Sequence, residues 1–378
     1  MSEWVKMQLG DAIQLKRGYD LPNQKRVTGA VPIVSSSGVS DFHNTAKVKA
    51  PGVITGRYGT IGQVFYVDKD FWPLNTTLYV EDFKTNEPLF ISYFLRTLDF
   101  QAFAAKSAVP GINRNDVHLA EIMLPDKCTQ KQISSVLVAY DNLIENNNRR
   151  IAILEEMAQR LYREWFVHFR FPGHENAEMV ASEFGMIPEG WRAMPFSEMA
   201  VFINGYAFKP SDWHKTGLPI IKIAELKNGV TSNTPYYPND LPDKYLVHNG
   251  DILFSWSADL NAYIWSGGDG WLNQHLFQCI PKMGRSKIVL YFSLLSKMSA
   301  FIDNTTGSTM KHIKKSELDI VKTVDPHLGV QKDFDIRVSP IINEIICLSH
   351  KTKILRKTRD HLLPRLISGD IDVSKIEL

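Results

Sequence analysis

The chain has 378 residues, of which 44% are hydrophobic and 22% charged, and its formal net charge at pH 7 is +2. This length predicts two or three domains, because single hydrophobic cores stop growing at roughly 250–300 residues. A balanced charge excludes a strongly basic protein, although a local basic surface can still attract phosphates. The sequence holds no run of 18 apolar residues and opens without a signal-peptide pattern, so we expect a cytoplasmic protein with no membrane span.

Residues 1–126 are predicted to form a compact α+β domain. Short β-branched and aromatic runs such as GVITG and TTLYVEDF are separated by glycine and proline, a pattern typical of brief strands joined by turns. Polar and aromatic stretches such as KRGYD and PLNTTL lie between these runs and are expected on loops.

Residues 127–170 are predicted to form one long helix. Apolar residues recur in alternating steps of four and three for more than four heptads, which indicates a helix that buries one stripe against another helix. Asn147 is a polar member of this stripe, and such a residue weakens a coiled coil but fixes its register. We hypothesise that Asn147 aligns the pair, the alternative being a solvated polar turn. The seam comprises Ile133, Leu137, Tyr140, Ile144, Asn147, Ile151, Leu154, Ala158, Leu161 and Trp165.

The second half of the chain repeats the first. The same residue types recur at a shift of 187 for Gly18 and Gly205, of 198 for Asn75 and Asn273, and of 201 from Pro125 onward. A repeat of this length predicts two copies of one architecture.

The repeat predicts a linker over residues 171–188, a second domain over 189–326, and a second long helix with a C-terminal tail over 327–378. Pro364 is expected to break or kink this helix, because proline removes a hydrogen bond of the helical ladder. Thr352 and Arg359 are poor seam residues in the second copy. Its apolar seam includes Ile345, Leu348, Leu355 and Leu362.

We expect the two helices to pair with each other. The predicted fold is α+β, with two tandem similar globular domains separated by an antiparallel coiled coil and related by a pseudo-two-fold axis. Ile133 to Trp165 would span about 48 Å at roughly 1.5 Å per residue, more than one DNA turn of about 34–36 Å. The alternative is that the stripe mediates homodimerisation.

Catalytic constellations are missing from the sequence. It contains no G-x-G-x-x-G, Walker, H-E-x-x-H or G-x-S-x-G motif and no paired cysteine ligands. His43, His118 and His168 have no companion at ligand spacing and are interpreted as surface or hydrogen-bonded histidines. The pattern favours binding over catalysis.

The chain resembles the specificity subunit of type I restriction-modification systems over nearly its full length. The resemblance is carried by the duplicated openings WVKMQLGDAIQLKRGYD and WRAMPFSEMAVFINGYAF, by GVITGRYGTIG and PLNTTLYV, and by the helical segment QKQISSVLVAYDNLIENNN with a counterpart ending HLLPRLISGDIDV. The second copy departs from the first where LGD becomes FSE.

The resemblance implies two target-recognition domains, each reading one half of a bipartite site in double-stranded DNA. It implies that the helices set the spacer and dock two modification (methyltransferase) subunits; restriction (endonuclease and translocase) subunits are partners that the sequence neither requires nor excludes. The chain itself is expected to be non-catalytic and to bind no cofactor or metal. S-adenosylmethionine, ATP and magnesium are expected on partner subunits that methylate adenine and cleave DNA.

Candidate DNA contacts follow from residue type and position. Arg, Lys, Asn and Gln can read base edges, whereas Ser, Thr and Lys more often position phosphates. The alternative for each is a turn or cap residue. We expect contacts from Arg17, Tyr19, Ser36, Arg57, Tyr58, Asn75, Thr76 and Arg114 in the first domain, and from Tyr206, Lys209, Trp256, Asn273, Gln274, Lys311 and Lys314 in the second.

Two other functions stay open from the sequence. The first is a stand-alone architectural protein that bridges DNA sites without methyltransferase partners. The second is an enzyme with an unrecognised site in one domain. Methyl transfer by the chain alone would favour the enzyme, and stable association with a methyltransferase would exclude the architectural protein.

Overall fold

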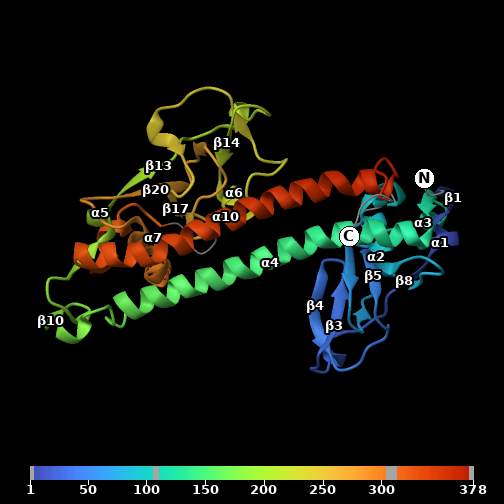
Figure 1. Ribbon diagram of the computed structural model, residues 1–378, viewed down its shortest axis with the longest axis horizontal. Helices are drawn as coiled ribbons and strands as arrows, with labels where there is room; N and C mark the ends of the chain where they lie inside the picture. The colour runs from blue at the N-terminus through green and yellow to red at the C-terminus, as the bar shows by residue number, and fades with distance from the viewer. Residues whose placement is uncertain (1–3, 105–109, 304–312, 374–378) are drawn as a thin grey trace. The chain divides into compact units, whose positions relative to one another are not determined.

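The computed structural model describes residues 4–104, 110–303 and 313–373 (Figure 1). It consists of two compact units: unit 1 comprises Met1–Glu145 and Ile354–Leu378, and unit 2 comprises Asn146–Lys353. Two 40-residue helices, α4 (Lys127–Phe166) and α10 (Leu328–Ile367), each contribute to both units.

Unit 1 is built on a four-stranded antiparallel sheet of order β2-β8-β5-β6. A three-stranded sheet, β4-β3-β7, and the pair β1-β9 complete it. Its strands are β1 (Trp4–Gln8), β2 (Gln14–Arg17), β3 (Val31–Ser35), β4 (Gly38–His43), β5 (Gly52–Gly56), β6 (Val64–Val67), β7 (Trp72–Pro73), β8 (Thr77–Asp82) and β9 (Glu121–Pro125). Its helices, besides parts of α4 and α10, are α1 (Leu9–Ala12), α2 (Pro88–Thr97), α3 (Arg114–His118), and the 3₁₀ turns η1 (Asn23–Lys25) and η2 (Phe100–Phe103).

Unit 2 repeats this plan with the sheet β13-β20-β17-β18 and the pair β12-β21. A second sheet, β15-β14-β19-β16, takes the place of β4-β3-β7. Its strands are β12 (Arg192–Pro195), β13 (Ala200–Asn204), β14 (Leu218–Ile221), β15 (Tyr236–Tyr237), β16 (Leu246–Val247), β17 (Ile252–Ser255), β18 (Asn261–Ile264), β19 (Gly270–Leu272), β20 (Leu276–Pro281) and β21 (Lys322–Asp325). Its helices are α5 (Phe196–Met199), α6 (Ile223–Asn228), α7 (Lys287–Ser296), α8 (Met298–Asp303), α9 (Glu317–Ile320), and the 3₁₀ turns η3 (His174–Asn176), η4 (Pro210–Asp212) and η5 (Asp243–Tyr245).

The hydrogen-bond register of the two units corrects one alignment drawn from the sequence. Gly56 pairs with Thr77 between β5 and β8, and Ser255 pairs with Leu276 between β17 and β20. Both members of the pair are therefore shifted by 199, not 198. The identical Leu-Asn dipeptides suggested 198, but a strand register shifted by one residue would turn every side chain to the other face. Asn75 consequently corresponds to Gln274, not to Asn273.

The repeated Gly-Tyr dipeptide has a structural cause. A Cβ atom on Gly18 would lie 2.1 Å from the carbonyl oxygen of Leu74, and one on Gly205 would lie 2.2 Å from that of Asn273. Only glycine lets the two backbone segments approach this closely. The dipeptide therefore holds the loop after β2, or after β13, against the loop that precedes β8 or β20.

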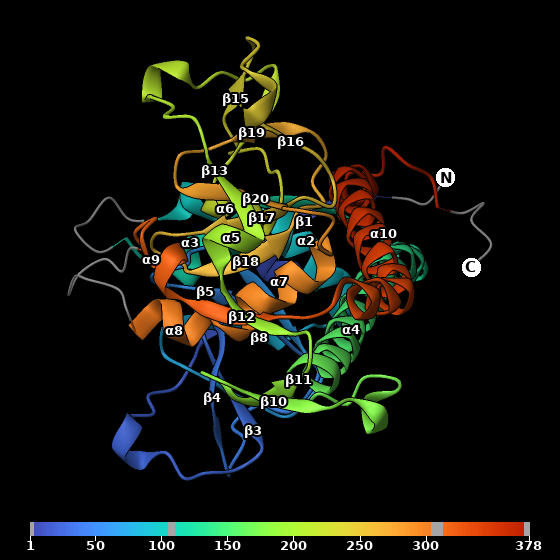
Figure 2. The same cartoon turned by 90° about the vertical axis from the view of Figure 1, so that its left-hand side faces the viewer.

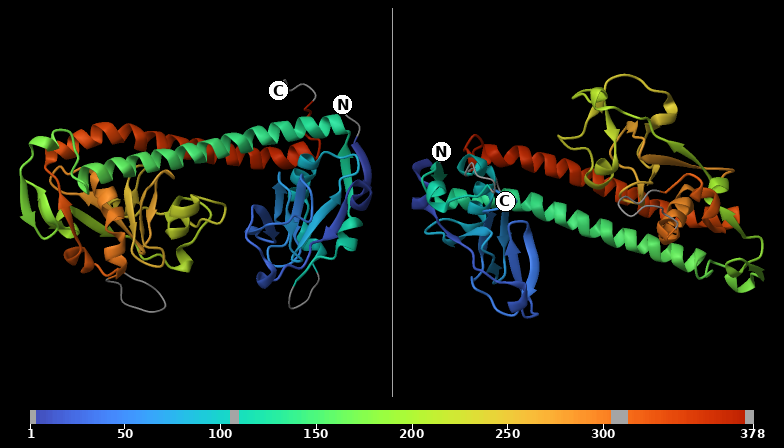
Figure 3. Two further views of the ribbon diagram at one scale, coloured as in Figure 1. Left: turned by 90° about the horizontal axis from the view of Figure 1, so that it is seen from below. Right: turned by 180° about the vertical axis from the view of Figure 1, so that it is seen from behind.

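The two long helices pair within each unit, as their heptads predict, and they run antiparallel (Figures 1 and 3). In unit 1, Arg359 Nη1 lies 2.6 Å from Asp141 Oδ1. In unit 2, the rings of Trp165 and Phe334 are 5.5 Å apart. Within unit 2, Arg150 of α4 contacts Glu344 of α10, whereas the later residue Trp165 contacts the earlier residue Phe334, so the two helices run in opposite directions. Every seam position of α4 and its equivalent 201 residues later is buried or half-buried.

The predicted break of the second helix at Pro364 is wrong. Helix α10 continues without interruption to Ile367. Pro364 lies in the last turn, where one lost hydrogen bond affects few residues, and Leu366 and Ile367 just beyond it are buried in the core of unit 1. That apolar burial favours the helix beyond the proline.

A glutamine clasp joins each long helix to its domain. Gln331 Nε2 donates to the carbonyl oxygen of Pro326 at 2.7 Å, and its Oε1 accepts the N–H of Ser286 at 2.9 Å. In unit 1, Gln130 Nε2 donates to the carbonyl of Pro125 at 3.0 Å and its Oε1 accepts the N–H of Glu87 at 2.9 Å. The repeated proline-to-glutamine spacing therefore builds the same joint twice.

The segment predicted as a loop or linker contains a β-hairpin. Strands β10 (Met179–Ser182) and β11 (Gly185–Pro188) pair antiparallel. Exposed residues occupy most of β10, which explains why the sequence shows little apolar alternation there. Trp191 follows the hairpin and stacks on Phe171, with ring centroids 5.1 Å apart, beside the end of α4.

Helix α7 connects the sheet of unit 2 with the long helices (Figure 2). Its residues Leu290 and Leu294 are buried in the core below the sheet. Val289 and Phe292, on another face of α7, are buried with residues of α4 and α10. The domain and its helices therefore share one continuous apolar interior within this unit.

Candidate nucleic-acid interface

Five loops of unit 1 meet where the strands of its sheets end. We call residues 17–20, 35–38, 56–63, 74–77 and 110–114 the reading loops of unit 1. Arg57 N–H donates to the carbonyl of Thr76 at 2.9 Å, and Ile112 N–H donates to the carbonyl of Arg57 at 3.1 Å. Thr60 Oγ1 donates to the carbonyl of Ser36 at 2.5 Å. Backbone bonds thus fix Arg57 between two other loops and bring most of the predicted residues of this domain together.

The side chains on these loops are polar and partly held by one another. Asn75 Nδ2 donates to Asp20 Oδ1, and Arg17 Nη2 lies 3.9 Å from the same oxygen. The Arg57 guanidinium lies 4.6 Å from the ring centroid of Tyr58. Such a set of amide, guanidinium and hydroxyl groups can form hydrogen bonds to base edges and phosphates.

Tyr19, also a predicted contact, is committed largely to packing. Its ring packs edge-on against Trp72 and lies against Tyr79, and the Tyr19 and Tyr79 hydroxyls are 3.0 Å apart. Burial, and then this hydrogen bond, raise the pKa of Tyr79. These contacts give the Tyr19 ring a packing role within its reading loop.

Unit 2 holds its equivalent loops with the same backbone bonds. We call residues 204–209, 255–258, 272–276 and 313–315 the reading loops of unit 2. Trp256 N–H donates to the carbonyl of His275 at 3.5 Å, and Ile313 N–H donates to the carbonyl of Trp256 at 2.8 Å. These are the bonds of Arg57 with Thr76 and Ile112, shifted by 199 and 201. The scaffold is repeated, whereas the side chains on it differ.

The outward side chains of unit 2 centre on Gln274 and His275. Trp256 Nε1 donates to the Gln274 carbonyl at 3.2 Å, so the indole supports this loop. Ser257 Oγ lies 3.3 Å from His275 Nδ1, and Gln274 Nε2 lies 3.5 Å from His275 Nε2. Asn273 is only 6% exposed, and its side-chain oxygen accepts the N–H of His275 at 3.3 Å. Asn273 therefore shapes the turn that presents its two neighbours.

The remaining predicted contacts lie at varied places. Lys209 and Lys314 are exposed on the reading loops of unit 2, and Arg114 is exposed at the start of α3 in unit 1. The ring of Tyr206 packs against Phe208 with centroids 5.0 Å apart, although its carbonyl accepts the N–H of Gln274. Lys311 lies outside the described residues.

Sequence reasoning missed Asp20, Thr60 and His275. Asp20 accepts the bond that orients Asn75, and Thr60 joins its loop to Ser36. His275 occupies the place of Thr76 in the second unit, which only the corrected shift of 199 reveals. The sequence signal for His275 was therefore present but displaced by one residue.

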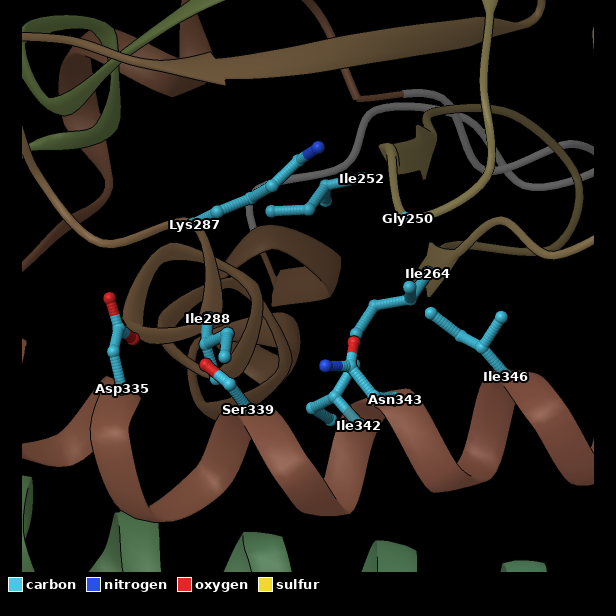
Figure 4. A pocket seen from close by; sticks show the side chains of 10 residues that line it. All are labelled: Gly250, Ile252, Ile264, Lys287, Ile288, Asp335, Ser339, Ile342, Asn343 and Ile346. Atoms are coloured by element: carbon cyan, nitrogen blue, oxygen red, sulfur yellow. The ribbon is translucent and has the colours of Figure 1, made fainter.

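A cavity of about 260 Å³ lies elsewhere in unit 2, between β17, β18, α7 and α10 (Figure 4). Its lining is chiefly isoleucine, with Lys287 and Asp335 among the polar residues, and it shares no residue with the reading loops. Among the described residues, no cluster of three or more His, Cys, Asp or Glu side chains could hold a metal. In the same part of the chain no helix has the length and apolar character needed to span a membrane.

Comparison with known proteins identifies relatives of this arrangement. The chain is 24% identical over 288 residues to the type I restriction enzyme MjaIX specificity subunit of Methanocaldococcus jannaschii, a match covering 71% of this chain and 65% of the relative. A match to the EcoBI specificity subunit of Escherichia coli, 27% identical, covers 51% of this chain and 43% of that protein. A third, to the HindI specificity subunit of Haemophilus influenzae, is 23% identical and covers 98% and 100% of the two chains. The chain thus spans less than two thirds of the first two relatives and all of the third.

A solved structure confirms the fold. The crystal structure of the type I restriction-modification system S subunit from M. genitalium matches with a TM-score of 0.64 at 14% identity, covering 97% of this chain and 96% of that chain. The family model described as the type I restriction modification DNA specificity domain matches twice, at residues 1–156 and 188–355. Each match contains one set of reading loops and part of one long helix. The chain therefore belongs to the type I restriction modification DNA specificity domain family.

Proposed function

We propose that this chain is the sequence-specific DNA-binding subunit of a type I restriction-modification complex. Each domain reads one half of a bipartite site through its reading loops. The paired helices set the spacer between the half-sites and dock two modification subunits.

The observation that carries this proposal is the repeated scaffold with divergent side chains. Arg57 and Trp256 have equivalent backbone bonds, and so do Thr76 and His275. Two domains that bind the same DNA backbone but different bases require a common framework and different outward groups. This pattern is expected of two readers of unlike half-sites.

Exposed apolar residues on the long helices support the docking role. Ile153 is 58% exposed and Ile354, its equivalent 201 residues later, is 53% exposed. Repetition of an exposed isoleucine on both helices fits two copies of one partner, because each copy would meet the same local surface. We expect Ile153→Ser and Ile354→Ser each to weaken retention of modification subunits.

Catalysis is assigned to the partners in this proposal. S-adenosylmethionine would bind to the modification subunits, and ATP and magnesium to restriction subunits where these are present. The chain would contribute base recognition and positioning, and no methyl or phosphoryl transfer of its own.

The test compares the purified chain with the reconstituted complex. The chain alone, incubated with DNA and radiolabelled S-adenosylmethionine, is expected to transfer no methyl group; after modification subunits are added, methylation appears on adenine. Methyl transfer by the chain alone would contradict the proposal and favour an enzyme. DNA bridging with no association to modification subunits would contradict it in favour of an architectural protein.

A further inference from the structure

Arg57 is half-buried, and backbone hydrogen bonds hold it against two other loops. Its N–H donates to the carbonyl of Thr76 at 2.9 Å, and its own carbonyl accepts the N–H of Ile112 at 3.1 Å. Ile112 is only 1% exposed, so the bond anchors Arg57 to the core of unit 1. The backbone from which the side chain projects is therefore fixed by two other loops.

The Arg57 guanidinium is held by a hydrogen bond at Nε and by the ring of Tyr58 against its face. Its Nε donates to the carbonyl of Ile112 at 3.3 Å, and its guanidinium carbon lies 4.6 Å from the ring centroid of Tyr58. Neither terminal nitrogen of Arg57 pairs with a carboxylate of the described residues. Four other arginines of unit 1, namely Arg17, Arg26, Arg96 and Arg359, lie within 4.0 Å of a carboxylate.

The Arg57 guanidinium is held at Nε, and neither of its terminal nitrogens pairs with a carboxylate in the described part of the chain. By its forked geometry it suits two groups of DNA. It can donate two parallel bonds to O6 and N7 of guanine in the major groove, or to a phosphate. Holding the stem before binding reduces the side-chain entropy lost on contact.

The second unit distinguishes these ligands. Its residue at the equivalent position is Trp256, whose indole N–H is already donated to the carbonyl of Gln274. A phosphate contact does not depend on the base sequence. Two domains that bind one duplex would therefore both be expected to retain an arginine that contacts a phosphate. A base contact changes when the half-site changes. The replacement of arginine by tryptophan on an otherwise repeated scaffold therefore favours a base as the ligand of Arg57.

We propose that Arg57 reads a guanine in the half-site of the first domain, donating from its terminal nitrogens to O6 and N7. Tyr58 and the Ile112 carbonyl position the guanidinium. Recognition of the second half-site uses Gln274 and His275 in place of an arginine. This inference rests on the proposed function, because it specifies one contact of the same surface.

The experiment measures binding of the reconstituted complex to duplexes in which every base pair of both half-sites is substituted in turn. The variants are Arg57→Ala and Arg57→Lys, which keeps the charge but lacks the fork. His275→Ala is the matched variant in unit 2 and identifies which half-site each domain reads. We expect both Arg57 variants to lose about 5- to 140-fold in discrimination at one guanine of the first half-site, the range for a bidentate base contact. Recognition of the second half-site should be unchanged, which also shows that the variants are folded.

Four results would overturn the inference. A uniform loss of affinity for all sequences with a smaller salt dependence would indicate a phosphate contact. Altered recognition of the second half-site, unchanged discrimination at guanine, or a first half-site without guanine would also contradict it. If Arg57→Ala fails to fold, Arg57→Lys decides alone. Failure of the proposed function gives a different result, because the wild-type complex would then show no bipartite site at all.

Discussion

Ile112 and Ile313 occupy the same place in the two units, and each is 1% exposed. Each donates its backbone N–H to the carbonyl of a half-buried residue on a neighbouring loop, Arg57 or Trp256. The repeat thus keeps the isoleucine that fixes this backbone and changes the residue that the isoleucine holds, arginine in unit 1 and tryptophan in unit 2. Under the proposed function, the specificity of each domain would depend on a few side chains carried by this repeated backbone.

His118 gives unit 1 a pH dependence. Its Nε2 accepts the N–H of Leu15 at 2.9 Å, which requires the neutral ring. Burial, and then Arg114 and Lys84, lower its pKa below the ordinary value of 6.5. The unfolded chain therefore binds more protons just below pH 6.5, and stability present above that pH is lost as pH falls. The sequence interpretation of this residue as hydrogen-bonded fits that geometry.

We expect His118→Gln, which retains an acceptor that does not titrate, to reduce the loss of thermal stability between pH 7 and about pH 5.5. The midpoint of thermal unfolding at each pH measures this. His168→Gln, at an exposed histidine of unit 2, is the matched control and should leave the difference between the two pH values in place. An equal loss in wild type and His118→Gln would show that His118 does not contribute.

The long helices depend at their beginnings on the glutamine clasps. Gln331 is buried and also donates to Asp325 Oδ1 at 3.3 Å, beside the two-pronged bond from Arg285 to that carboxylate. Loss of one partner leaves the others buried and unsatisfied, which costs more than the bond itself contributes.

Gln331→Ala is expected to lower the free energy of unfolding of unit 2 by about 1–3 kcal/mol, because the Ser286 N–H and the Pro326 carbonyl lose a buried partner. Chemical denaturation followed by tryptophan fluorescence measures the change. Lys332→Ala, at the exposed neighbouring position, should stay within roughly 0.5 kcal/mol of wild type. Equal stability of the two variants would contradict the clasp.

Asn147 lies in a polar layer of the seam. Asn147 is 8% exposed and Thr352 is 6% exposed. The register defined by Trp165 and Phe334 places these two residues opposite each other. Thr352 Oγ1 is buried and has no hydrogen-bond partner among the described residues. Counting in opposite directions along the two helices from Trp165 and Phe334 thus brings Thr352, predicted to be a poor seam residue, level with the asparagine that interrupts the first stripe.

We predict that Asn147→Leu raises thermal stability but weakens the register, so that the complex accepts a wider range of spacer lengths or the chain self-associates. Thr352→Val is the companion variant: it removes an unsatisfied hydroxyl, raises stability by roughly 1 kcal/mol and keeps Asn147. Light scattering and binding to duplexes of graded spacer length measure the outcome. A monomer with unchanged spacer preference would refute the register hypothesis for Asn147.

Elements that depend on local residue patterns could be predicted from the sequence, whereas contacts between loops that are distant in the sequence could not. The seam followed from a period of 3.5 residues, which needs no knowledge of the rest of the fold. The contact of Arg57 with Thr76 and Ile112 depends on the strand order β2-β8-β5-β6, which joins distant segments. The choice of Asn273 instead of His275 came from a one-residue shift that only the strand register corrects.

At the scale of the whole molecule, unit 1 takes its residues from both ends of the chain. Leu366 and Ile367 of α10 are buried with residues of the first domain such as Leu9 and Phe94. The C-terminal helix is therefore part of the structure that holds the first set of reading loops. Equally, the end of α4 is buried in unit 2.

Leu366→Ala is expected to destabilise unit 1 by about 2–5 kcal/mol, as for other buried leucines, although it lies in the last helix of the chain. Hydrogen exchange of β2, β5 and β8 should accelerate while that of β17 and β20 stays unchanged. His361→Ala, exposed on the same helix, is the control. Accelerated exchange confined to unit 2 would contradict the assignment of this segment to unit 1.

The proposed function requires two domains that read different half-sites. Mapping of methylated adenines after co-expression with modification subunits tests this most directly, for wild type and for the double variant Gln274→Ala/His275→Ala. We predict a split motif with a fixed spacer in the wild type, and a change confined to one half of the motif in the variant. A single continuous motif, or a variant that alters both halves alike, would contradict the two-reader account.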